Sequence, residues 1–107
     1  MGLKMTEKQL SQSIVDEARN CGWKVNRPWL SIHSPKGFPD LVLTRDGFLA
    51  FWELKSAVGK VSDSQQEWLN ALSMVPGVDV RTVRPDDLED VYRYLVEPTP
   101  HKWTGSS

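Results

Sequence analysis

Apolar residues fill most of the stretch from Gly37 to Lys55, and the dipeptide Asp46-Gly47 divides it into two runs. Asp-Gly between apolar runs is typical of a β-hairpin, because both residues tolerate the positive φ angles of a type I′ turn. With these two residues as the loop, Arg45 pairs with Phe48, and further pairs follow outward along the strands. Strand alternation then makes both faces of the hairpin apolar, which predicts that it lies in the centre of a sheet. One face carries Leu41, Leu43, Trp52 and Leu54, and the other carries Val42, Leu49 and Phe51.

A first helix is predicted ahead of the hairpin. Thr6 and Gln9 form a capping-box pattern, in which a hydroxyl residue and a glutamine three positions later exchange hydrogen bonds with each other's backbone. The helix is expected to run to about Asn20, where Cys21-Gly22 ends it in a left-handed turn. Its predicted buried stripe consists of Leu10, Ile14, Ala18 and Cys21.

Two more helices are predicted after the hairpin. Ser62 and Gln65 repeat the capping-box pattern and begin a helix that ends at Pro76-Gly77. A last helix begins at Pro85, where the fixed φ of proline suits a first turn. Helical periodicity predicts the apolar faces, which are Trp68, Leu69, Leu72 and Val75 in the earlier helix and Leu88, Val91, Tyr92 and Leu95 in the later one.

Two further strands complete the predicted order of elements. Residues 23–25 alternate in polarity, as do residues 78–83, and each segment is long enough for a strand. The order is therefore α-β-β-β-α-β-α, which belongs to the α/β class. Three consecutive strands followed by a helical crossover to a fourth predict a mixed sheet flanked by helices. We expect one domain over residues 1–97 and a frayed tail over residues 98–107, in which Trp103 is a candidate docking residue.

The composition says more about the expected cellular location of the protein than about its function. The 107 residues carry a net charge of −1, divided into +3 over residues 1–60 and −4 over residues 61–107. The basic half contains the hairpin, which is compatible with a side that faces phosphate groups. The lone Cys21 excludes an internal disulfide and a cysteine-built zinc site, and we expect a reduced, cytoplasmic location. No apolar run approaches the ~20 residues of a membrane span, so no membrane partner is expected.

The hairpin register produces the main candidate site. Asp40 falls directly opposite Glu53, and cross-strand neighbours have Cβ atoms roughly 4.5–5.5 Å apart. Lys55 lies two residues beyond Glu53 and therefore on the same face of the strand. Two opposed carboxylates near a buried sheet repel each other unless a cation joins them, and a hard divalent ion suits such a pair. The alternative is an ordinary hairpin with solvated polar ends.

Three other residues have two possible roles each. Glu7 either complements the dipole of the first helix or belongs to the site, since it lies one turn before the buried stripe. Gln65 either serves only the capping box or also orients a water molecule or a phosphate group. His33, in the irregular segment before the hairpin, is either an exposed loop residue or a substrate contact.

These residues resemble a known nuclease pattern. Pro39-Asp40, twelve intervening residues and Glu53-Leu54-Lys55 resemble the PD-(D/E)xK signature. The wider pattern is similar to that of the VRR-NUC family and runs from about residue 6 to residue 84. It comprises Thr6-Glu7, Gly22-Trp23, Gly37-Phe38-Pro39-Asp40-Leu41, Glu53-Leu54-Lys55, Gly59, Ser62, Gln65 and Trp68-Leu69.

The resemblance implies a restriction-endonuclease-like core and cleavage of DNA phosphodiester bonds that depends on Mg²⁺ or Mn²⁺. It implies that Asp40, Glu53 and the backbone carbonyl of Leu54 bind the metal ion and that Lys55 is the catalytic lysine. It also equates Glu7 with an acidic residue of the first helix and Gln65 with a glutamine of the helix after the motif. Stand-alone proteins of this type resemble compact virus-type nucleases, which act as homodimers on branched DNA such as four-way junctions. The alternatives are a nicking or mismatch-type nuclease of the same superfamily and a non-catalytic nucleic-acid-binding module.

Overall fold

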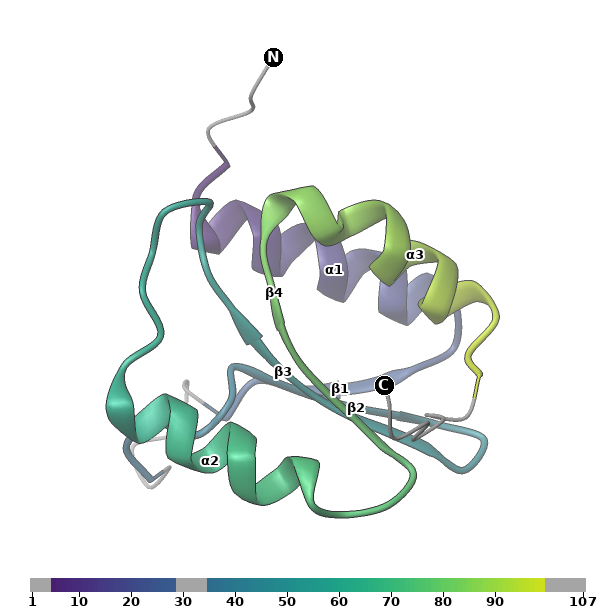
Figure 1. Ribbon diagram of the computed structural model, residues 1–107. Helices are drawn as coiled ribbons and strands as arrows, with labels where there is room; N and C mark the ends of the chain where they lie inside the picture. The colour runs from purple at the N-terminus through teal and green to yellow at the C-terminus, as the bar shows by residue number, and fades with distance from the viewer. Residues whose placement is uncertain (1–4, 29–34, 100–107) are drawn as a thin grey trace.

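A mixed four-stranded sheet with the strand order β1-β2-β3-β4 forms the centre of the protein. The computed structural model describes residues 5–28 and 35–99 of the chain. Helices α1 and α3 pack together on one face of the sheet, and α2 covers the other face (Figure 1). The elements are α1 (Glu7–Asn20), β1 (Lys24–Asn26), β2 (Leu41–Arg45), β3 (Phe48–Leu54), α2 (Asp63–Ser73), β4 (Val78–Val83), the 3₁₀ turn η2 (Pro85–Asp87) and α3 (Leu88–Val96). The predicted α/β class with a mixed sheet flanked by helices is confirmed, and the structure adds the short 3₁₀ turn η2 to the predicted order.

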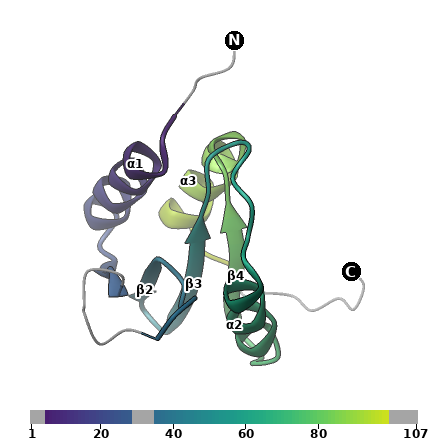
Figure 2. The same cartoon turned by 90° about the vertical axis from the view of Figure 1, so that its left-hand side faces the viewer.

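The predicted hairpin is present with the predicted register. Arg45 pairs with Phe48, and the pairing continues to Leu41 opposite Trp52. Asp46 and Gly47 have φ angles of 50° and 88°, as a type I′ turn requires. β3 lies between β2 and β4, and it runs antiparallel to β2 and parallel to β4 (Figure 2).

Both predicted capping boxes are present, and they begin the two helices that flank the hairpin. The Thr6 hydroxyl accepts a hydrogen bond from the Gln9 amide, and the Gln9 side chain accepts one from the Thr6 amide. Ser62 and Gln65 make the same reciprocal pair at the start of α2. These local bonds satisfy backbone donors that the first turn of a helix leaves free, which is why the starts of both helices could be predicted to the residue.

The main core lies between the sheet and the pair α1 and α3. It contains the predicted hairpin face Leu41, Leu43, Trp52 and Leu54 together with Leu10, Ile14, Val15, Ala18, Trp23, Ala50, Val83, Val91, Tyr94 and Leu95. The opposite hairpin face is only half-buried, because α2 covers it over a shorter distance. Phe38 fills part of that layer, with its ring 4.8 Å from the Trp68 ring and 6.0 Å from the Phe51 ring.

Several predicted faces differ from the observed ones. Leu69 is the one residue that α2 buries fully, and Val75 lies beyond the end of the helix, where it is 48% exposed. The reason is that α2 packs mainly on β4, at the edge of the sheet. In α3 the buried tyrosine is Tyr94, whereas Tyr92 is half-buried, because Val91, Tyr94 and Leu95 form the stripe that faces the core. Cys21 is half-buried, and β1 begins one residue later than predicted.

A buried ion pair ties β4 to this core. Asp79 is 7% exposed and accepts two hydrogen bonds from Arg81, at 2.7 and 2.6 Å. The Trp52 indole also donates to Asp79, at 2.9 Å. The Arg81 guanidinium lies over the rings of Trp52 and Tyr94, which adds cation–π contacts. Because the carboxylate is surrounded by donors, this pair is a structural element of the core.

Gly37 lets the segment before β2 approach α2 closely. Its φ is +85°, and a Cβ atom there would lie 2.6 Å from the backbone carbon of Ser64.

We expect Gly37→Ala to lower the free energy of unfolding, measured in a urea titration, by more than Gly47→Ala does. Gly47 also has a positive φ, but a Cβ atom there would meet nothing within 4 Å. Left-handed strain costs about 1–2 kcal/mol in both variants, and steric overlap adds about 1–3 kcal/mol for Gly37 alone. Equal losses would contradict the close approach.

Some predictions fall outside the described residues. His33 and Trp103 lie there, as does most of the predicted tail. None of the helices in residues 5–28 and 35–99 combines the length and the apolar character needed to cross a membrane.

Candidate functional site

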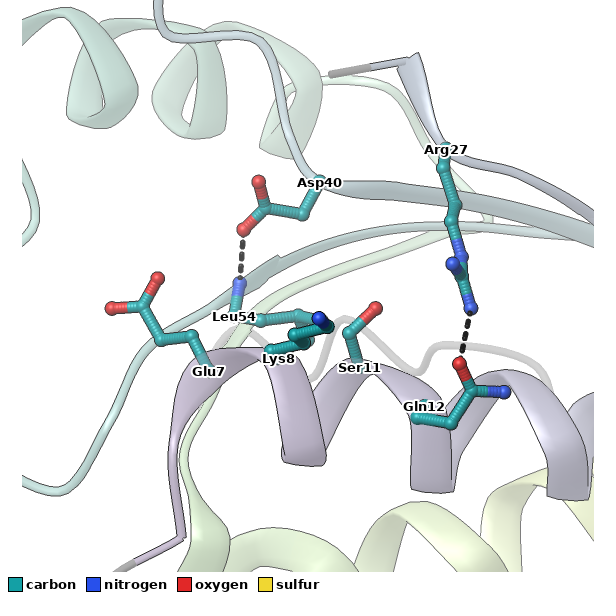
Figure 3. A pocket seen from close by; sticks show the side chains of 7 residues that line it. All are labelled: Glu7, Lys8, Ser11, Gln12, Arg27, Asp40 and Leu54. Atoms are coloured by element: carbon teal, nitrogen blue, oxygen red, sulfur yellow. Dashed lines mark hydrogen bonds between the residues drawn. The ribbon is translucent and has the colours of Figure 1, made fainter. Parts of the chain in front are cut away.

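Asp40 lies immediately before β2, at the end of the hairpin opposite the turn. Its Oδ2 atom accepts a hydrogen bond from the backbone amide of Leu54, at 2.9 Å (Figure 3). This bond fixes the carboxylate against the end of β3. The strand register, continued by one pair beyond Leu41 and Trp52, places Asp40 opposite Glu53 as predicted.

Glu53 is the most deeply buried charged residue of the site, at 1% exposure. Its Oε2 atom accepts a hydrogen bond from Gln65 Nε2 at 2.8 Å and lies 3.8 Å from Lys55 Nζ. Its Oε1 atom is buried and accepts no hydrogen bond from an N–H or hydroxyl group in the described part of the chain. The Asp40 and Glu53 side chains are close enough to hydrogen-bond to each other when one of the two acids is protonated. A buried acceptor without such a donor is costly, so Glu53 Oε1 is available for a ligand that the fold itself does not supply.

The two facing acids are not free to ionise as ordinary surface acids do. Burial, followed by the charge of Asp40, raises the pKa of Glu53 to about 8, and Lys55 lowers it only in part. Burial also raises the pKa of Asp40, although the hydrogen bond from Leu54 opposes this. A divalent cation between the two carboxylates would let both ionise, because it replaces the missing solvation and removes their repulsion.

Glu7 lies in the first turn of α1 and is exposed, but it also borders the site. It lines the same groove as Asp40 and Leu54, and its charge raises the pKa of both Asp40 and Glu53. The geometry is therefore compatible with both roles considered for it. Within residues 5–28 and 35–99, no group of three or more His, Cys, Asp or Glu side chains is arranged to hold a metal ion.

A comparison with models of protein families shows the family of the chain. The model of the VRR-NUC domain matches residues 4–86 of the chain. The chain belongs to the VRR-NUC family. None of the curated proteins and none of the solved structures in the comparison matches it. The VRR-NUC match covers Glu7, Asp40, Glu53, Lys55 and Gln65.

Membership of the VRR-NUC family implies a nuclease-type function with DNA as the substrate. The four-stranded mixed sheet flanked by helices is consistent with a restriction-endonuclease-like fold. Of the residues in the VRR-NUC sequence pattern, Asp40, Glu53 and Lys55 lie together around the start of β2 and the end of β3. Gly22 and Trp23 instead lie beside Arg45, at the turn end of the hairpin.

Gln65 makes the predicted capping-box bond and, in addition, a bond to Glu53 that was not predicted. Its Oε1 atom accepts a hydrogen bond from the Ser62 amide, which completes the capping box. Its Nε2 atom donates to Glu53. The direct partner of Gln65 in the site is thus the Glu53 carboxylate.

Arg84 was not predicted as a functional residue, and it stabilises the loop that follows Lys55. Its Nη1 atom donates to the carbonyl oxygens of Ser56 and Gly59, at 2.8 and 2.7 Å. These bonds hold the loop that follows Lys55. A Cβ atom at Gly59 would lie 3.3 Å from Glu7 Oε2, so this loop also packs against the first turn of α1.

No sequence signal identifies Arg84, because it lies 28 residues from Ser56 in the chain.

Proposed function

We propose that this VRR-NUC protein is a divalent-metal-dependent DNA endonuclease that hydrolyses phosphodiester bonds and selects branched DNA such as four-way junctions. The observation that carries the proposal is Glu53 Oε1, a buried acceptor that no N–H or hydroxyl group of the described residues satisfies, in a carboxylate that faces a second acid of raised pKa. A purely structural site gains nothing from facing acids that destabilise each other. Cation binding provides a reason for them.

Asp40, Glu53 and the backbone carbonyl of Leu54 are the proposed ligands, with Glu7 as an acid next to them. Mg²⁺ suits carboxylate and carbonyl oxygens, and Mn²⁺ accepts the same donors. A bound divalent ion supplies Lewis-acid charge at the scissile phosphate and lowers the pKa of a coordinated water molecule.

Lys55 and Gln65 have supporting roles in the proposed site. Lys55 Nζ lies 3.8 Å from Glu53 Oε2 and only 13% of its side chain is exposed, so its positive charge is held at the site. We propose that it orients the attacking water molecule and offsets the negative charge that develops on the phosphate. Gln65 keeps the Glu53 carboxylate in one orientation, through a side chain that is itself fixed by the start of α2.

A substrate panel tests the proposal first. Single-stranded, duplex, flap and four-way-junction DNA of matched sequence are incubated with Mg²⁺, with Mn²⁺ and with a chelator. We expect cleavage only with a divalent ion and fastest cleavage of branched DNA. Nicking of duplex or mismatched DNA would instead favour the second type of nuclease, and tight binding without any cleavage would favour a binding module. Cleavage that survives the chelator would contradict metal dependence.

We also propose that the protein acts as a homodimer. Each protomer measures 32 × 29 × 29 Å and has one candidate site, whereas two symmetric cuts in a junction require two sites. Sedimentation at micromolar concentration is expected to give about twice the mass of one chain. A monomeric profile would contradict the dimer, as would paired cuts by a proven monomer.

A further inference from the structure

A groove continues from the acids along the side of α1. It has a volume of about 370 Å³. Its lining residues come from the N-terminal half of α1, from the chain after β1 and from the facing ends of β2 and β3 (Figure 3). They are Glu7, Lys8, Ser11, Gln12, Arg27, Asp40 and Leu54. The proposed function uses Glu7, Asp40 and Leu54, and it leaves the other four without a role.

Two of those four carry donor groups that the fold does not satisfy. Ser11 is 7% exposed, and its hydroxyl has no hydrogen-bond partner among the described residues. The Nε atom of Arg27 is likewise buried and unpartnered there. Within the described residues, the guanidinium makes one long contact, from Nη2 to Gln12 Oε1 at 3.5 Å. Buried donors are nearly always paired in folded proteins, so two unpaired donors in one groove indicate that the groove receives an acceptor.

The charges along the groove are separated by sign. Glu7 and Asp40 lie toward one end and Arg27 lies toward the other, with Ser11 between them (Figure 3). Lys8 adds a second positive charge to the lining. An acceptor that is also an anion fits the Arg27 end, since guanidinium and hydroxyl groups both donate to phosphate oxygens. A nucleic-acid strand carries such groups at regular intervals.

We propose that Arg27 and Ser11, with Lys8, bind a backbone phosphate that neighbours the scissile phosphate on the strand being cut. The inference rests on the proposed nuclease function, and it adds the path of the substrate strand along the groove. The acidic end of the groove receives the phosphate that is hydrolysed, and the basic end receives the next one. Arg27 and Ser11 are positioning residues, because they hold the strand and do not touch the reacting atoms.

Binding measured separately from cleavage provides the first test. In a Lys55→Ala background, DNA affinity is measured against salt concentration for the parent, for added Arg27→Gln and for added Arg19→Gln. Arg19 is exposed in the last turn of α1, far from the groove, and controls for the loss of one positive charge. We expect Arg27→Gln to weaken binding roughly tenfold. It should also reduce the slope of log affinity against log salt by about 0.7 on single strands or about 0.9 on duplex DNA. Equal slopes for the two variants would overturn the proposal.

Ser11→Ala separates ligand binding from a structural role. Removing a buried hydroxyl that has no partner should leave the melting temperature unchanged or higher, while KM for DNA rises and kcat stays constant. A lower melting temperature with unchanged KM would show that the hydroxyl serves the fold, and it would contradict its role in the subsite.

A scan with neutral methylphosphonate linkages locates the phosphate. One linkage beside the scissile bond should raise the half-saturating DNA concentration of the wild type about tenfold and should cause no further loss in Arg27→Gln. Equal losses in both proteins at every position would contradict the assignment. If the wild type binds DNA with the expected slope difference but never cleaves it, the nuclease proposal fails and the phosphate subsite stands.

Discussion

Lys55→Ala is expected to reduce metal-dependent DNA cleavage by at least about 10²–10³-fold, the usual loss when a charge-stabilising group is removed from an active site. The lysine is the cation nearest to Glu53, at 3.8 Å. Its loss removes the positive charge that is proposed to orient the water molecule and the scissile phosphate. Asp40→Asn is expected to be equally inactive, because it removes one proposed ligand while keeping an acceptor for the Leu54 amide.

Both variants should fold, since neither residue belongs to the apolar core. Single-turnover rates at saturating Mg²⁺ measure the effect, and circular dichroism and the melting temperature check the fold. Lys60→Ala is the matched control, because Lys60 is exposed in the same loop. Near wild-type turnover in a folded preparation of either site variant would remove the assignment of that residue.

The metal-free protein is expected to lose stability as the pH rises from about 5 to above 8. The pKa of Glu53 is about 8 in the folded chain, against 4.5 for an ordinary glutamate. Its stabilising contribution is therefore complete below pH 4.5 and is lost as the pH rises through 8, with a slope of up to about 1.4 kcal/mol per pH unit. The raised pKa of Asp40 acts in the same direction.

Glu53→Gln is expected to flatten this dependence and to be more stable than the wild type at pH 8 in a chelator. It also removes the response of stability to added Mg²⁺, since a bound cation stabilises the protein that holds both carboxylates. Urea unfolding between pH 5 and 9, with and without Mg²⁺, measures both effects. Glu67→Gln, on the exposed face of α2, is the control and should keep the wild-type pH dependence. Parallel curves of unfolding free energy against pH for the wild type and Glu53→Gln would contradict the raised pKa of Glu53.

The parts of the fold that sequence predicted correctly depend on short-range rules. The Asp46-Gly47 turn sets the hairpin register, and the register alone brings Asp40 opposite Glu53. Thr6 and Ser62 begin their helices through bonds that span three residues. Each of these features is determined by neighbours in the chain, so a local pattern carries the information.

The features that sequence missed depend on partners far along the chain. Arg84 holds the loop of Ser56 and Gly59, and Trp52 meets Asp79 across 27 residues. Such pairs have no spacing that repeats, and a charged residue in a strand is usually read as solvent-facing. The groove beside α1 was missed for the same reason, because Ser11 and Arg27 meet only in the folded chain. Val75 was misassigned because helical periodicity does not reveal where a helix stops packing.

The double attachment of Gln65 restricts which variants of this protein can evolve or be designed. Either glutamine or glutamate completes a capping box, so helix formation alone would accept both. A glutamate would bring a further acidic group against the buried Glu53, where the amide now donates at 2.8 Å. Gln65→Glu would thus keep the capping box of α2 but would introduce repulsion between the first turn of α2 and the Glu53 carboxylate. Position 65 and the facing acids therefore have to change together.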